Sequence, residues 1–199
     1  MTDPSRMRNT LLLIEAARVG DGAAVERLIP LSTPSFNCDK ALRVAAEHGN
    51  TECLTLLLPY SVLLNTDAVP LLLAAENGHV ACVEALAPFL AEGLEEWNQA
   101  LFAATCAGHA ECVRFLVARA QPQDKNSRAL MAAVIYEHSA CVDILYPHSD
   151  PVEALDELVR LRPKYSGAEE QLRAVIARHQ RAVIAQVVGE RETGAARKL

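Results

Sequence analysis

The sequence has few aromatic residues and no long apolar run. Aromatic residues make up 5% of the 199 residues, with a single tryptophan, Trp97. Alanine, leucine and valine must therefore carry the core, which is typical of closely packed thin helices. No run approaches the roughly 18 apolar residues that cross a bilayer, and Leu11–Ile14 is too short for the core of a secretory signal. We expect a cytoplasmic protein without a membrane segment.

Basic residues are outnumbered, and catalytic motifs are missing. The chain has 19 Lys and Arg against 25 Asp and Glu, a net charge of −6, which argues against nucleic-acid binding through phosphate neutralisation. The sequence contains no G-x-S-x-G, H-E-x-x-H or C-x-x-C motif and no phosphate-cradling glycine loop. We therefore predict a protein that is not an enzyme, with no catalytic residues, no metal and no cofactor.

What the sequence does contain is a regular series of cysteines. Cys53, Cys82, Cys112 and Cys141 are spaced by 29, 30 and 29 residues. A glycine stands four residues before each of the first three cysteines, and the same frame extends in both directions along the chain. It defines five units, centred on the following positions: Gly20, Gly49, Gly78, Gly108 and Glu137. A fixed period of this length indicates a repeat array.

Each unit predicts two short antiparallel helices. The first is about two turns long, as in Lys40–Glu47, and ends at the glycine, which adopts positive φ at little cost. The second, as in Glu52–Leu58, is stopped by a proline such as Pro59. Polar residues ahead of the first helices are expected to be N-caps: Asn37, Asp39, Asn65, Asp67, Asn126 and Ser127. If the turn needs positive φ, Glu137 costs about 1 kcal/mol there.

The frame is lost after Pro147. We expect helices over 152–161 and 168–188 to close the array as a C-terminal cap, because a terminal interface needs a polar outer face. The predicted division is therefore 1–148 for the five repeats, 149–188 for the capping pair and 189–199 for a disordered tail.

The repeats resemble those of a known family. Residues 69–86 read VPLLLAAENGHVACVEAL, which is similar to the ankyrin repeat, and five units share this frame. The resemblance implies an all-α, ankyrin-like solenoid of helix-turn-helix repeats. The period is shorter than the ankyrin value of about 33 residues, so we expect short loops in place of hairpins.

Cysteines and histidines that recur in register invite a hypothesis of metal binding or catalysis. Equivalent positions in stacked helices lie about 8–10 Å apart, too far for one zinc ion or for a disulfide between units. We interpret the four cysteines as buried apolar residues, and Cys38 and Cys106 as exposed thiols. His79, His109 and His138 are expected to bond backbone between helices, and His179 to pack within the last helix pair.

The resemblance implies a protein-binding scaffold whose partner docks on the concave face. Core positions are fixed by stacking, so the two positions before each turn can vary. The candidate contact residues are Arg18, Val19, Glu47, His48, Glu76, Asn77, Cys106, Ala107, Ile135 and Tyr136, with Trp97, Asp39, Asp67 and Lys125 from the loops. Trp97 could instead plug the junction between two units. Because this face is acidic at its middle and apolar at its far end, we expect a partner protein with a basic patch beside an apolar one.

Two alternatives stay open. The long C-terminal helix could pair with its copy, so that the protein is a monomer or a weak dimer. A small enzyme or ligand site could lie in the cap, around His179. The repeats are also similar in style to bacterial and viral ones, so delivery into a host cell is possible if the source is microbial.

Overall fold

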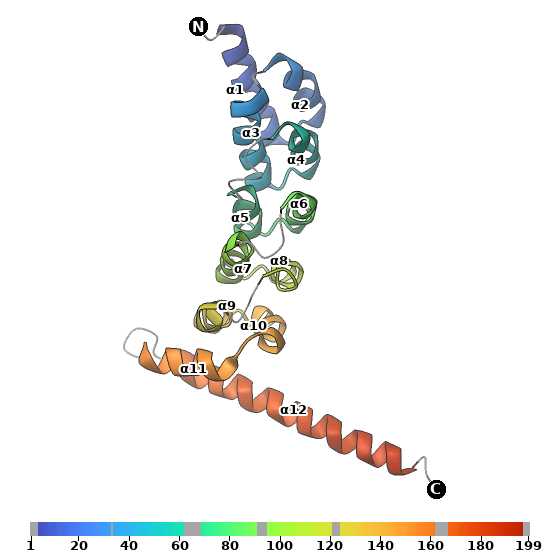
Figure 1. Cartoon of the computed structure of the whole chain (residues 1–199), viewed down its shortest axis with the longest axis vertical. Helices are drawn as coiled ribbons and strands as arrows, with labels where there is room; N and C mark the ends of the chain where they lie inside the picture. Colours follow the sequence, from blue (N-terminus) through green and yellow to red (C-terminus); the bar gives the residue numbers. More distant parts are fainter. Residues whose placement is uncertain are drawn as a thin grey trace.

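The fold is known from a computed structural model, and it is an elongated stack of helix pairs closed at one end by two further helices (Figure 1). The structure describes residues 4–32, 34–61, 69–90, 95–120, 124–161 and 167–196. Within these ranges every regular element is a helix. The predicted fold class, an all-α solenoid with a C-terminal helical cap, is confirmed.

The helices alternate between two layers. The first helices of the units are α1 (Pro4–Val19), α3 (Pro34–His48), α5 (Val69–Glu76), α7 (Glu95–Ala107) and α9 (Asp124–Ile135). The second helices are α2 (Gly22–Leu28), α4 (Thr51–Leu57), α6 (Val80–Leu86), α8 (Ala110–Leu116) and α10 (Ser139–Leu145). First helices stack on first helices and second helices on second helices (Figure 1). The cap consists of α11 (Pro151–Arg160) and α12 (Ala168–Ala196).

One continuous core runs between the layers. The alanine pairs of the first helices, such as Ala45 and Ala46, are fully buried, as are the four cysteines of the second helices. Small side chains in one layer let neighbouring first helices approach closely, while leucines of the second helices fill the interior. The apolar stripe that repeats in the sequence is thus the surface along which units stack.

The turn between the two helices of each unit needs a left-handed residue. Gly20, Gly49, Gly78 and Gly108 have φ between 74° and 80°, and Glu137 has φ 61° at the equivalent position. The predicted positive φ is confirmed, including at the one position without glycine. All five units therefore share one backbone turn, whatever residue occupies it.

The first helices begin earlier than predicted. The helix α3 begins at Pro34 rather than near Lys40, so Asn37 and Asp39 lie inside the helix and do not cap it. Asn126 and Ser127 likewise lie inside α9, and Asn65 and Asp67 lie outside the described residues. Asp39 is buried and accepts a hydrogen bond from the hydroxyl of Ser61 (2.6 Å). The polar residue predicted to be a cap instead joins the first helix of its unit to the segment that follows the second helix of the same unit.

The cap packs on the last repeat. The helix α11 begins where expected, because the carboxylate of Asp150 accepts hydrogen bonds from the backbone N–H groups of Val152 and Glu153. Both α11 and α12 contact α9. Two side chains of α12 reach the last second helix and the turn that follows it: Arg178 forms an ion pair with Asp143, and His179 stacks on Tyr146. The surface that a sixth unit would cover is thus covered by the cap.

The last helix is longer than predicted. It continues through Ala196 instead of ending near residue 188, so it includes most of the segment predicted to be a disordered tail. Alanine, glutamate and arginine are strong helix formers, and they make up much of this segment. Among the described residues, no helix is both long and apolar enough to cross a membrane.

Candidate partner-binding face

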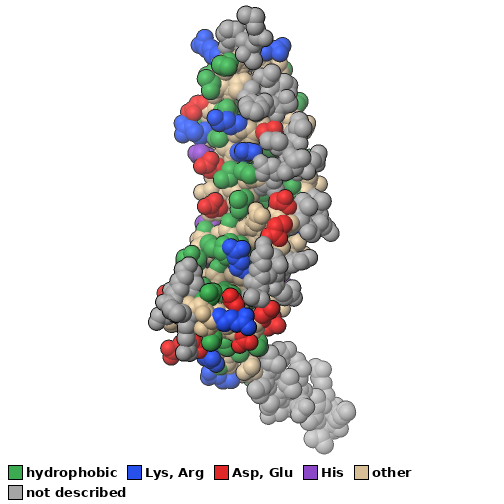
Figure 2. All heavy atoms as spheres, turned by 60° about the vertical axis from the view of Figure 1, so that its left-hand side comes forward, with side chains coloured by type: hydrophobic (Ala, Val, Ile, Leu, Met, Phe, Trp, Pro, Cys, Tyr) green, Lys and Arg blue, Asp and Glu red, His purple; other side chains and the backbone are tan. Residues whose placement is uncertain are grey.

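The ten residues predicted just before the turns lie at the C-terminal ends of the first helices or immediately after them. Eight of the ten are exposed, whereas Cys106 and Ile135 are half-buried. Together with the outward side chains one and two helical turns earlier, they form what we call the first-helix face. Figure 2 brings this side of the molecule forward and shows hydrophobic side chains among charged ones of both signs.

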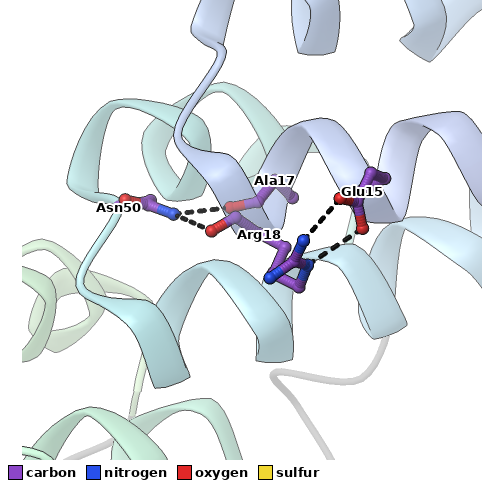
Figure 3. Close-up of polar contacts among 4 residues, drawn as sticks. All are labelled: Glu15, Ala17, Arg18 and Asn50. Atoms are coloured by element: carbon purple, nitrogen blue, oxygen red, sulfur yellow. Dashed lines mark hydrogen bonds and ion pairs between the residues drawn. The ribbon is translucent and has the colours of Figure 1, made fainter.

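The first unit presents a charge pair on this face. The guanidinium of Arg18 donates two hydrogen bonds to the carboxylate of Glu15, at 2.9 and 2.6 Å (Figure 3). The hydrogen bonds to Arg18 lower the pKa of Glu15. Because both side chains are more than half exposed, this pair contributes little to stability. Its effect on a partner would be small, since the two charges compensate each other.

The middle of the first-helix face carries negative charges that no nearby basic side chain among the described residues neutralises. Glu47 lies in the last turn of α3, before the final residue His48. Glu76 ends α5, and both carboxylates are exposed. No ion pair joins either carboxylate to another described residue. The side chain of His48 is held locally, through a contact between its Nδ1 and the carbonyl oxygen of Val44 (3.0 Å). The two glutamates thus present negative charge on consecutive units.

The far end of the face is more apolar. Tyr136 is 56% exposed and its ring lies 6.2 Å from that of His138. Phe102 lies under the guanidinium of Arg128, with 4.3 Å from the carbon of that group to the ring centre. Such cation–π contacts are worth about 0.5–1 kcal/mol at exposed sites. The aromatic ring is thereby fixed at the surface beside Cys106.

Two residues predicted for this face do not belong to it. Trp97 lies inside α7 rather than in a loop, and it is 1% exposed. The guanidinium of Arg119, which follows the second helix of the same unit, lies 6.0 Å from the ring centre. The buried indole is therefore a structural residue and not an exposed contact. Asp39 is also wrong as a contact residue, since it is buried against Ser61. Asp67 and the side chain of Lys125 lie outside the described residues.

A second row of partly exposed side chains, not identified from the sequence, lies one helical turn closer to the N-terminus of the first helices. Arg43, Leu72 and Phe102 occupy one equivalent position in units two, three and four, and all are partly exposed. The available signal was that this position also fails to repeat, changing from cation to aliphatic to aromatic. They widen the face from one row of residues to two.

The turns are braced by the next unit along the chain. The side-chain amide of Asn50 donates to the carbonyl oxygens of Ala17 (2.7 Å) and Arg18 (2.9 Å) (Figure 3). In later units a histidine does this: Nε2 of His79 bonds to the carbonyl oxygen of Glu47, and Nε2 of His138 to that of Cys106, both at 3.0 Å. Because a carbonyl oxygen only accepts, Nε2 carries the proton in both rings. These residues hold the first-helix ends that present the face.

The cysteines have the structural role predicted for them. Cys53, Cys82, Cys112 and Cys141 are fully buried free thiols. Burial raises the pKa of each, that of Cys112 to about 11, which keeps the thiol protonated and unreactive at neutral pH. Cys106 is half-buried rather than exposed, and burial raises its pKa too. The side chain of Cys38 lies outside the described residues.

Candidate metal and catalytic groups do not converge in the described part of the chain. No three His, Cys, Asp or Glu side chains there come together in a way that could hold a metal ion. His179 is half-buried, stacks on Tyr146 at 3.9 Å between ring centres, and its Nδ1 lies 3.0 Å from the carbonyl oxygen of Val175. Its surroundings are those of the packing residue that we expected.

Comparisons with known proteins agree with this geometry. The solved structures include a similar one, the crystal structure of human ASB11 ankyrin repeat domain, with a TM-score of 0.60 and 24% identity. The match covers 80% of this chain and 95% of that one, and at this identity it shows the fold alone. No curated protein matches significantly. Ankyrin repeats are generally protein–protein interaction modules and are typically not catalytic. The family described as "Ankyrin repeats (3 copies)" matches residues 13–96 and 87–154, and the chain therefore belongs to the ankyrin-repeat family.

Proposed function

We propose that this chain binds a partner protein through the first-helix face. The observation that carries the proposal is the contrast between repeating and non-repeating positions. Residues that stack one unit on the next are alike and buried, whereas the exposed residues before the turns differ from unit to unit. Stacking does not require that variety, so the face is free to match a particular surface.

The chemistry of the face indicates the chemistry of the partner. Glu47 and Glu76 provide negative charge at its middle, while Phe102 and Tyr136 provide apolar surface at its far end. A complementary partner has a basic patch beside an apolar one. Charge complementarity across such a contact acts mainly on the association rate, and the buried apolar contacts set the lifetime of the complex.

The test uses a pair of charge-reversal variants with matched net charge. Glu47→Lys with Glu76→Lys reverses the face, whereas Glu26→Lys with Glu84→Lys makes the same change in charge on exposed residues of the second helices. A partner is first identified by quantitative affinity capture with the unaltered chain. We expect the first variant to lower the association rate about 10-fold and the second to leave it nearly unchanged. Equal effects of the two variants would contradict use of the first-helix face.

Self-association through α12 is a second candidate, favoured by one observation. The helix runs through Ala196, and Figure 1 shows its second half projecting beyond the repeats. A chain ending at Ala182 keeps the half of α12 that carries Arg178 and His179, so the cap contacts are retained. If α12 pairs with its copy, light scattering will give a dimer mass for the full chain and a monomer mass for the shortened one. A monomer mass for both would exclude this candidate.

A further inference from the structure

A pocket lies between α12 and the last repeat, lined by residues of α9, α10 and α12 and by Glu137 of the turn between α9 and α10. Its volume is about 230 Å³. The apolar part of its lining includes Ala133, Val142 and Val175, and the charged or amide side chains in it are Glu137, Gln171 and Arg178. The pocket is therefore a small apolar depression with a polar rim, large enough for a few non-hydrogen atoms.

The equivalent space is filled in the preceding units. A Cβ atom at Gly49 would lie 2.5 Å from Nδ1 of His79, and at Gly78 it would lie 2.6 Å from Nδ1 of His109. In these units the ring of the next unit packs directly against the turn. Among the described residues after the fifth unit, α11 and α12 take the place of a further repeat, and α12 packs against α9. The side chain of Glu137 and the pocket it lines occupy the place where a clamping ring would otherwise lie.

Glutamate at position 137 is energetically unfavourable for the backbone of this turn. Its φ of 61° is the conformation that glycine adopts cheaply, and a non-glycine residue there costs about 1 kcal/mol. Its carboxylate is also positioned, since Nε2 of Gln171 donates to Oε1 at 3.2 Å. A strained residue that lines a pocket supports a hypothesis of function.

The charges around the pocket do not cancel. Arg178 lines it, but its guanidinium is paired with the carboxylate of Asp143. The lining itself carries one carboxylate, Glu137, and one guanidinium, Arg178. The carboxylate of Asp143, which pairs with Arg178 from outside the lining, brings the sum for the pocket and its immediate surroundings to one negative charge. A ligand that fits this arrangement has a compact apolar body for the valine and alanine side chains and a cationic hydrogen-bond donor for Glu137.

We propose that this pocket binds a small protonated alkylamine with a branched carbon body. The ammonium group donates to the carboxylate of Glu137, and the alkyl group covers Val142 and Val175. A ligand of about six non-hydrogen atoms in an open pocket makes few contacts, so the expected dissociation constant is about 1 mM. The proposal does not rest on the proposed protein-binding function, and its test requires no partner protein.

The test compares three probes with the same carbon skeleton. Isopentylamine, isopentanol and isovalerate carry a cationic, a neutral and an anionic head group. Each is titrated into the full ¹⁵N-labelled chain at neutral pH while amide chemical shifts are followed. We expect isopentylamine to shift the amides of α10 and the first half of α12, and to bind at least 5-fold more tightly than the alcohol. Binding of isovalerate as tight as that of the amine, or no binding of the amine, would overturn the proposal.

Two variants with the same change of chemistry separate the pocket from general charge. Glu137→Gln keeps the size and the backbone requirement but removes the charge, and it should weaken isopentylamine binding at least 5-fold. Glu153→Gln removes an exposed carboxylate of α11 outside the pocket, and it should leave binding unchanged. Native-like amide spectra will show that both variants are folded. Unchanged affinity in Glu137→Gln would refute the assigned role of Glu137.

Discussion

The fifth turn of the array differs from the four before it, and the difference separates two reasons for glycine. In the first four units the turn has positive φ, and a side chain of the next unit also packs against it. At Glu137 the positive φ remains, but no such clamp follows, and a large side chain is accommodated. Where units stack, glycine is therefore favoured both by the positive φ and by the close packing of the next unit. At the fifth turn it is favoured by the positive φ alone.

The largest effect should come from adding one methyl group at a stacked turn. Gly49→Ala places a non-glycine residue at φ 74° and puts its Cβ 2.5 Å from the ring of His79. Backbone strain of about 1–2 kcal/mol and overpacking of about 1–3 kcal/mol act together. We expect a loss of about 3 kcal/mol in the free energy of unfolding, measured by urea denaturation.

The matched control is Glu137→Ala at the unclamped turn. It keeps a non-glycine residue at positive φ and introduces no clash, so its stability should lie within about 0.5 kcal/mol of the unaltered chain. If Gly49→Ala lowers the free energy of unfolding as little as this control, the ring of His79 moves aside freely. Close packing of that ring would then not require glycine at position 49.

Removing the His79 ring that packs against the turn should cause a smaller loss of stability. His79→Ala deletes the hydrogen bond from Nε2 to the carbonyl oxygen of Glu47 and the packing of the ring on Gly49, at a cost of about 1.5 kcal/mol. In the Gly49→Ala background the same change also relieves the clash. The double variant should therefore be more stable than the sum of the single losses, by about 1 kcal/mol in a double-mutant cycle. Additive losses would show that the two residues do not interact.

The repeat frame could be predicted from the sequence because stacking imposes it. Each cysteine and alanine pair repeats since every unit buries the same positions against its neighbours, and the periodic glycine indicated the turn. The bridging role of the histidines followed from their place directly after it, and it is confirmed for His79 and His138. The positions buried by stacking and the turns between the helices of each unit were thus predicted correctly.

The errors fell where the units differ from one another. Trp97 was predicted to lie in a loop, yet Glu95 and Glu96 begin a longer helix and the indole is buried. Asp39 was taken for a cap, although its partner is Ser61, which follows the second helix of the same unit, 22 residues along the chain. The pocket beside Glu137 depends on how α12 crosses the last repeat. Such contacts depend on tertiary packing, which a local pattern does not reveal.

The buried thiols predict a pH dependence that the first unit lacks, since Ala24 stands where the other units have cysteine. Burial raises the pKa of Cys112 from 9.0 to about 11. The unfolded chain therefore releases this proton at lower pH than the folded one, and stability is complete below pH 9 and falls between pH 9 and 11. At pH 10 the loss from one such thiol is about 1 kcal/mol.

Cys112→Val isolates this contribution, because valine fills a similar volume without titrating. Urea denaturation at pH 7.5 and pH 10 should show a smaller drop in stability for the variant than for the unaltered chain, by about 1 kcal/mol. An identical drop in both would mean that Cys112 does not cause the pH dependence.

The smallest expected change has the opposite sign. Glu137→Gly removes the cost of positive φ at the fifth turn and, against this, gives up an exposed hydrogen bond with Gln171 and some entropy of the unfolded chain. We expect a net gain of about 0.5–1 kcal/mol in the free energy of unfolding, measured by urea denaturation. Gln171→Ala in the same background should then be neutral, because its acceptor is gone. A destabilising Glu137→Gly would mean that contacts of the carboxylate outweigh the backbone strain, so that the last turn is stabilised by its side chain just as the earlier turns are stabilised by their clamps.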